Sequence, residues 1–114
     1  MPPVTLDTLP QAVTRYLAAH RLHDTAAELA NFTQDATVTD DGTTHSGIDA
    51  IELWMNRTAG EYSYTIEPIA VHETPDREYT VTQRLEGDFP GGVVDLHFRF
   101  TLRDGLIERL VIEG

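Results

Sequence analysis

The first sixty residues follow the period of an amphipathic helix in three separate stretches. In the first, Val13, Tyr16 and Leu17 form one apolar stripe, and Pro10 stands near the first helical position. These residues predict a helix from Pro10 to about Leu22. A tyrosine on the core face of a helix needs a partner for its hydroxyl group, because an unpaired buried hydroxyl weakens the fold. What Tyr16 faces is therefore the first question about function.

Two further helices are expected before the pattern changes. One covers 25–32, with Asp24 as its cap and with Leu29 and Phe32 facing the core. The next begins after Ser46, which forms a capping box with an acidic residue three positions on, and we expect Gly60 to end it. Its apolar stripe consists of Ile48, Ile51, Trp54 and Met55.

Strands are predicted wherever apolar and polar residues alternate. "ATVTDDGTTHSG" gives two short strands around the turn Asp41-Gly42, and the segment 93–113 gives a hairpin around Asp104-Gly105. Apolar residues change phase at Pro68, which predicts a bulge or a sheet edge. A Pro75-Asp76 turn leads into the strand before the loop 86–92.

This order predicts an α+β domain in which three helices cover one face of a curved antiparallel sheet and leave a pocket between the layers. Residues 93–103 alternate strictly, with Leu96 and Phe98 on the apolar side and Asp95, His97 and Arg99 on the polar side. A chain of 114 residues suits one domain, so we expect a single unit over 1–114.

The composition of the chain argues against several classes of function. The net charge of -11 would repel phosphates and anionic lipids, so we expect neither nucleic acid nor a membrane surface as a partner. The chain has no cysteine, which excludes disulfides and thiolate chemistry. Its five histidines show no metal-binding spacing, so we expect no metal and no cofactor. The sequence shows no signal peptide and no apolar run of membrane-spanning length, and we expect a cytoplasmic protein.

The element order and four sequence phrases are shared with a known group of proteins; the phrases are "VTRYLAAH", "DATVTDDG", "SGIDAIELW" and "LHFRFTLRDGLI". In these features the chain resembles the NTF2-like superfamily, and within it the SnoaL-like and ketosteroid-isomerase-like proteins. The resemblance spans nearly the whole chain. It implies a cone-shaped fold around a pocket for a small molecule, and it leaves the function open because this fold carries isomerases, cyclases and binding modules alike.

The isomerase pattern carries over in part. The family's tyrosine that donates to the substrate's carbonyl oxygen falls on Tyr16, and its general-base aspartate falls on Asp40. The family's protonated acid falls on Leu96, so that donor is missing, and the supporting tyrosine of the third helix falls on Met55. Losing one such donor typically costs on the order of 10²–10³ in rate.

Each candidate also has a structural interpretation. Asp40 is either a proton acceptor in the pocket or a solvated residue of the hairpin, and Tyr16 either donates into the pocket or is a core tyrosine satisfied by a backbone group or a water. We expect His45, Trp54, Phe32, Leu96 and Phe98 to contact the ligand. Core packing is the alternative for the two large aromatic residues on the helices, and a surface position is the alternative for His45.

The resemblance therefore favours a pocket for a small apolar or cyclic metabolite, in which Asp40 moves a proton and Tyr16 polarises an oxygen during isomerisation or cyclisation. The alternative is a non-catalytic module for ligand binding or dimerisation. We also expect a homodimer formed through the polar face of the sheet that carries Asp95, His97, Arg99 and Thr101.

Overall fold

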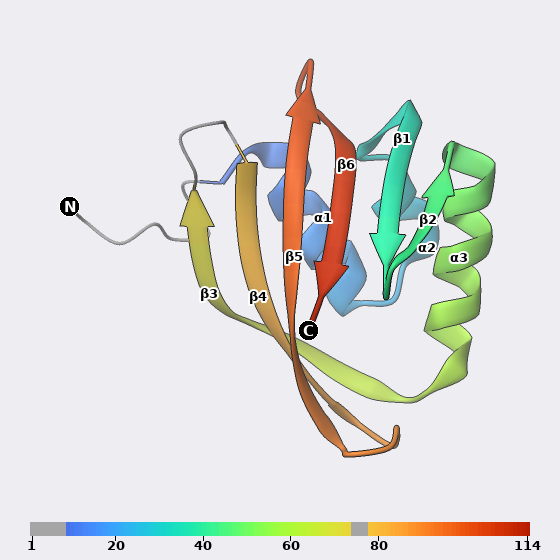
Figure 1. Cartoon of the computed structure of the whole chain (residues 1–114), viewed down its shortest axis with the longest axis vertical. Helices are drawn as coiled ribbons and strands as arrows, with labels where there is room; N and C mark the ends of the chain where they lie inside the picture. The colour runs from blue at the N-terminus through green and yellow to red at the C-terminus, as the bar shows by residue number, and fades with distance from the viewer. Residues whose placement is uncertain (1–8, 74–77) are drawn as a thin grey trace.

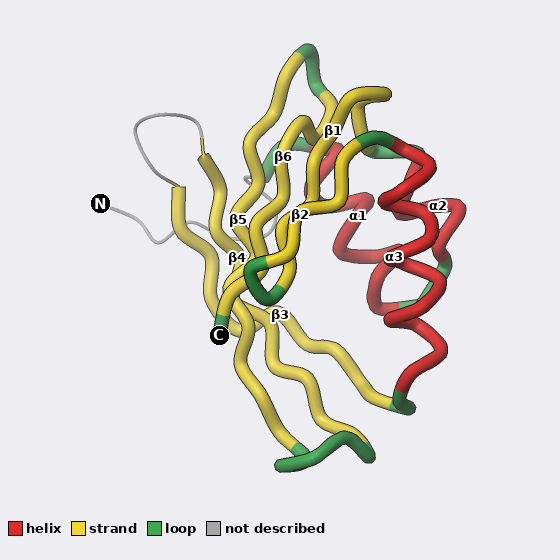
Figure 2. The backbone as a smooth tube through the Cα atoms, turned by 45° about the vertical axis from the view of Figure 1, so that its right-hand side comes forward, coloured by secondary structure: helices red, strands yellow, loops and turns green. Residues whose placement is uncertain are grey.

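A computed structural model describes residues 9–73 and 78–114; the Pro75-Asp76 turn lies outside the described residues. Its elements are α1 (Gln11–Arg21), α2 (Thr25–Leu29), β1 (Phe32–Asp40), β2 (Thr43–Ser46), α3 (Ile48–Glu61), β3 (Tyr64–Glu73), β4 (Glu78–Gly87), β5 (Val93–Arg103) and β6 (Leu106–Glu113). The helices pack on one face of a strongly curved sheet (Figures 1 and 2). The α+β architecture with three helices is confirmed.

The sheet is mixed, which corrects the expectation of a purely antiparallel sheet. Its order is β2-β1-β6-β5-β4-β3, and β6 runs parallel to β1 while the other neighbours are antiparallel. Sequential hairpins account for the antiparallel pairs. The parallel pair joins segments about 70 residues apart in the chain, so no local turn signal predicts it.

Turn chemistry explains where the hairpins close. Asp41 and Gly42 have φ of 51° and 78°, and Asp104 and Gly105 have φ of 52° and 81°. Positive φ at both central residues matches the twist of a tight hairpin, and Asp and Gly tolerate that conformation. Both predicted turns are confirmed, as is the bulge, because the β3–β4 register shifts between Pro68 and Ala70.

Two predicted helix ends are wrong for identifiable reasons. The second helix ends at Leu29 because the Asn31 side chain donates to the carbonyl oxygens of Ala27 (2.9 Å) and Glu28 (3.3 Å), and Phe32 therefore begins β1. The third helix is capped by Gly47, at φ 86°, without a side-chain hydrogen bond.

The third helix differs from the prediction in two smaller ways. Ser46 stays in β2, where it pairs with Thr37, so the predicted capping box does not form. The helix also runs one residue past Gly60, to Glu61.

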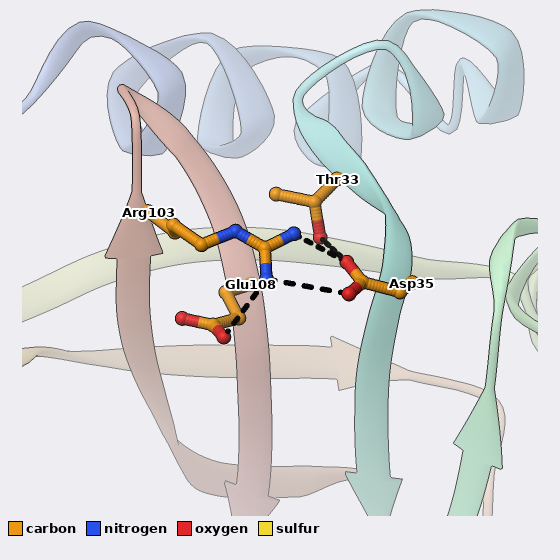
Figure 3. Close-up of polar contacts among 4 residues, drawn as sticks. All are labelled: Thr33, Asp35, Arg103 and Glu108. Atoms are coloured by element: carbon orange, nitrogen blue, oxygen red, sulfur yellow. Dashed lines mark hydrogen bonds and ion pairs between the residues drawn. The ribbon is translucent and has the colours of Figure 1, made fainter.

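The core lies between the helices and the inner face of the sheet. The predicted stripes are buried there: Val13, Tyr16 and Leu17 from α1, and Ile51, Trp54 and Met55 from α3. On the opposite face, polar side chains pair across strands. Arg103 of β5 pairs with Asp35 of β1 at 2.5 Å and with Glu108 of β6 at 3.4 Å (Figure 3).

The residues expected at a dimer contact also lie on this outer face. Arg84 pairs with Asp95 at 2.9 Å, His97 contacts Thr82 at 2.8 Å, and Arg99 pairs with Glu113. Dimerisation through this face stays a prediction.

Candidate active site

A cavity of about 110 Å³ lies between the helices and the inner face of the sheet. All three helices and five of the six strands contribute to its wall. The lining residues are His20, His23, Glu28, Asp40, Trp54, Met55, Thr58, Ala59, Tyr64, Leu85, Leu96, Phe98 and Ile112. An apolar cavity of roughly 150 Å³ holds benzene in another protein. This cavity therefore suits at most a single ring, unless the ligand extends through the mouth.

Asp40 reaches the cavity because of strand alternation. Ala36 and Val38 are fully buried on the inner face of β1, and Asp40 follows at the same period of two. The Trp54 Nε1–H donates to Asp40 Oδ2 at 3.0 Å, which fixes the orientation of the carboxylate. A second hollow next to the C-terminus is also bordered by Asp40, Leu96 and Ile112. The Asp40 carboxylate therefore stands where the cavity meets solvent.

Glu28 is a second carboxyl group in the same wall, and sequence reasoning missed it. It is the one buried residue of α2, with an exposed fraction of 4%, and its carboxyl group has no hydrogen-bond partner among the described residues. Burial, followed by the nearby Asp24 carboxylate, raises the pKa of Glu28 to about 7. The available signal was its position between two alanines and Leu29 in a short helix.

His20 is held neutral in the cavity wall. Burial, followed by the neighbouring His23, lowers the pKa of His20 to about 4. The side-chain amide of Gln83, which is fully buried, contacts His20 Nδ1 at 3.3 Å. If the amide donates, His20 accepts at Nδ1 and carries its proton on Nε2. Gln83 lies on the inner face of β4 opposite Leu96, and no local pattern marks it.

His23 and Tyr64 form another part of the wall. The Nε2 atom of His23 lies 3.2 Å from the Tyr64 carbonyl oxygen, and the two rings meet edge to face at 4.9 Å. Burial, then the charge of Glu28, raises the pKa of the Tyr64 hydroxyl. These residues are 41 positions apart in the chain. Only the folded structure brings them together.

Tyr16 is fully buried, and its hydroxyl has no hydrogen-bond partner among the described residues. Its ring packs against His20 (5.5 Å), Phe32 (5.7 Å) and Phe100 (5.4 Å). Burial, then the charge of Glu28, raises the pKa of the hydroxyl well above its usual value. Tyr16 is not one of the residues that line the cavity.

The structure divides the residues expected at the site. Four of them line the cavity: Asp40, Trp54, Leu96 and Phe98. Three do not: Tyr16, Phe32 and His45. Phe32 is buried in the core, and His45 stacks on Trp54 with 5.9 Å between ring centroids. The functional roles assigned to all seven residues stay predictions.

The described residues show neither a metal-binding group nor a membrane-spanning helix. Within 9–73 and 78–114, no three His, Cys, Asp or Glu side chains are grouped so that they could hold a metal ion. None of the helices in these residues combines the length and the apolar character needed to cross a membrane.

Similarity to solved structures extends over almost the whole chain. A candidate polyketide cyclase from Sinorhizobium meliloti is 35% identical, with a TM-score of 0.88, and the match covers 96% of this chain and 100% of that one. A protein of ketosteroid-isomerase-like fold from Catenulispora acidiphila, in complex with trimethylamine, is 22% identical with a TM-score of 0.79, covering 94% and 87%.

A third similar structure is SalBIII, an epoxide hydrolase/cyclase-like enzyme with a role in pyran ring formation in the polyether salinomycin. It is 22% identical, with a TM-score of 0.76, and the match covers 90% of this chain and 86% of SalBIII. The two likenesses at 22% identity establish the fold alone. A search of curated protein sequences finds no significant match.

A family model confirms the resemblance first noted in the sequence. The model for the SnoaL-like domain matches residues 13–110. Three helices on a curved six-stranded mixed sheet also agree with the ketosteroid-isomerase-like fold. The chain belongs to the SnoaL-like domain family.

Proposed function

We propose that the chain binds a small carbonyl-bearing metabolite in the 110 Å³ cavity and moves a proton on it, as an isomerase or cyclase, with Asp40 as the base. One observation carries this proposal: Asp40 stands in a wall that also contains Leu96, Phe98 and Ile112, and Trp54 holds one of its oxygens. A carboxylate held in a fixed orientation within reach of a bound ligand is placed to act as a general base.

The chemistry starts at a carbon next to a carbonyl group. The Asp40 carboxylate removes a proton from this carbon, and the electrons of the C–H bond form an enolate. In isomerisation of a β,γ-unsaturated carbonyl compound, the enolate is conjugated with the C=C bond; the carboxylic acid so formed returns the proton to the γ-carbon, and the double bond moves next to the carbonyl. In aldol-type cyclisation, the enolate carbon bonds to a second carbonyl carbon of the same molecule, and the new alkoxide takes the proton.

A hydrogen-bond donor to the enolate oxygen would lower the barrier further. The resemblance assigns this role to Tyr16, whose hydroxyl lies in the core beside the cavity wall. The assignment requires a ligand to reach that hydroxyl, although Tyr16 is fully buried and its ring stacks on His20. Tyr64 is a phenol that already lines the cavity.

Similar proteins support this class of reaction. The 35% identical protein from Sinorhizobium meliloti is a candidate polyketide cyclase, and SalBIII takes part in ring formation. Because the cavity suits about one ring, we propose a substrate of that size or one whose remaining part extends out of the mouth.

Exchange of the α-hydrogens of cyclohexanone in D₂O, followed by proton NMR, tests the proposal. The protein is expected to accelerate exchange, and Asp40→Asn to reduce the rate by about 10²–10⁴-fold, the usual contribution of a general base. Asparagine keeps an oxygen that accepts from Trp54, so the variant is expected to fold. Asp41→Asn in the adjacent turn is the matched control and should leave exchange unchanged.

The outcome also separates the second candidate, a non-catalytic binding module. Leu96, where the family's acid would stand, favours that candidate because it removes one donor from the cavity. Exchange at the buffer rate, together with a change in the fluorescence of Trp54 when cyclohexanone is added, would support the binding module and reject Asp40 as a base. Trp54 is the single tryptophan of the chain, so the signal comes from the cavity wall.

A further inference from the structure

Glu28 is a buried acid that the proposed proton transfer does not use. Its exposed fraction is 4%, it lines the cavity, and the described residues supply no hydrogen bond or ion pair to its carboxyl group. A buried carboxylate without a partner is costly, and natural proteins usually give such a group a cation or hydrogen-bond donors. The missing partner is expected to come from the ligand.

No guanidinium group faces this carboxyl group from the cavity wall. The wall holds two carboxyl groups, Glu28 and Asp40, and among its described residues there is neither arginine nor lysine. The chain contains no lysine at all, so it cannot supply an ammonium group from its own side chains. His20 stays neutral because burial lowers its pKa to about 4.

The remaining wall is suited to an organic cation. Trp54, Tyr64 and Phe98 contribute aromatic rings to the cavity, and a cation close to the face of such a ring is attracted by the ring's electron density. An anion would meet two carboxyl groups and a chain whose net charge is -11.

We infer that the cavity takes a small protonated amine, with Glu28 as its counter-ion and the aromatic wall around its carbon groups. This inference rests on the proposed function, since it makes the substrate a carbonyl compound that also carries an amino group. Glu28 would hold the ammonium group from α2, while Asp40, at the end of β1, acts on the carbon next to the carbonyl.

The binding should depend on pH through Glu28. Its pKa is about 7 without ligand, and an ammonium group beside it favours the ionised form. Affinity for the amine should therefore rise as pH increases through about 7, with release of a proton. The other titratable groups near this carboxyl are Asp24, Tyr16, His20, His23, Asp40 and Tyr64.

Three ligands with one ring and different charges test the inference: cyclohexylammonium, cyclohexanol and cyclohexanecarboxylate. Each is titrated into the protein at about pH 8, with Trp54 fluorescence as the readout. We expect cyclohexylammonium to bind about tenfold or more tightly than cyclohexanol, the effect of one charge-assisted hydrogen bond, and the carboxylate to bind most weakly.

Glu28→Gln should remove the preference for the amine and leave the affinity for cyclohexanol unchanged. It should also abolish the rise in amine affinity between about pH 6 and about pH 8. Glu52→Gln, on the exposed side of α3, removes one negative charge elsewhere and should preserve both effects. Glutamine has nearly the shape of glutamate, so cyclohexanol binding also reports that the variant is folded.

Equal affinity for the amine and the alcohol, tighter binding of the carboxylate, or a preference that survives Glu28→Gln would each overturn the inference. These results are independent of the exchange experiment. Absence of the amine preference alone would overturn the amine site but not the role of Asp40 as the base. Conversely, if Asp40→Asn leaves the rate of cyclohexanone exchange unchanged, the proposed reaction is rejected while the amine site is unaffected.

Discussion

The inner face of β5 borders the solid core at one end of the strand and the cavity at the other. Phe100 is fully buried against Tyr16, Phe98 is 2% exposed at the cavity wall, and Leu96 is half-buried beside the hollow. In the sequence, all three residues occupy the apolar positions of the same alternation of apolar and polar residues. The difference comes from what lies opposite them, since the sheet curves and β3, β4 and β5 extend past the helices (Figure 2). Apolar alternation therefore predicts the inner face but not whether that face is filled.

The test with the largest expected effect compares two side-chain truncations to alanine on β5. Phe100→Ala should lower the free energy of unfolding by about 3–5 kcal/mol, because it leaves a cavity in packed surroundings. Leu96→Ala should lower it by only about 1 kcal/mol, because its side chain borders space that is already empty. Urea unfolding of both variants measures the difference. Equal losses would mean that the cavity is closed by packing in solution.

A second test uses the pH dependence of stability at Glu28. Below its ordinary pKa of 4.5 the carboxyl is protonated in both states; between 4.5 and about 7 only the folded protein keeps the proton. The free energy of unfolding should therefore fall as pH rises through this window, and the contribution is fully lost above about 7. At about 1.4 kcal/mol per pKa unit, the loss is about 3 kcal/mol.

Glu28→Gln isolates this effect from the other titrating groups. The variant should match the wild type in acid and exceed its stability above neutral pH, as measured by urea unfolding at a series of pH values. Glu52→Gln is again the control. A constant difference between Glu28→Gln and wild type at every pH would show that Glu28 is solvated.

The smallest effect is expected at Tyr16, on the packed side. Tyr16→Phe removes a buried hydroxyl that has no partner among the described residues and keeps the ring, so stability should rise by up to about 1 kcal/mol. Unchanged cyclohexanone exchange would make Tyr16 a core residue without a role in the reaction. A loss of exchange would instead show that the hydroxyl reaches the ligand, as the family resemblance predicts.

Local signals in the sequence predicted most of the fold. Helix stripes, the two Asp-Gly hairpins and the bulge after Pro68 depend on neighbouring residues, and all are present. The early end of α2 was missed because Asn31 caps it with its side chain, an interaction that apolar periodicity does not register. The parallel β1–β6 pair was missed because the two segments are distant in the chain.

The site could be predicted only where strand alternation decides the direction of a side chain. Asp40, Leu96 and Phe98 follow from the alternation of β1 and β5, and they line the cavity. Glu28 and His23 come from a five-residue helix and a turn, where the sequence sets no period long enough to fix a face. His20 continues the apolar stripe of α1, four residues after Tyr16, and this signal was missed. Their approach to Asp40 depends on how the helices pack.

The position of β6 between β1 and β5 bears on how the protein is made. As the chain leaves the ribosome, β1–β2 and β3–β4–β5 can each form early, but they stay separate pieces until residues 106–113 emerge and join them. Such late, long-range closure slows folding and leaves strand edges open in the meantime. Nascent chains that stall before residue 106 should therefore depend on chaperones most strongly.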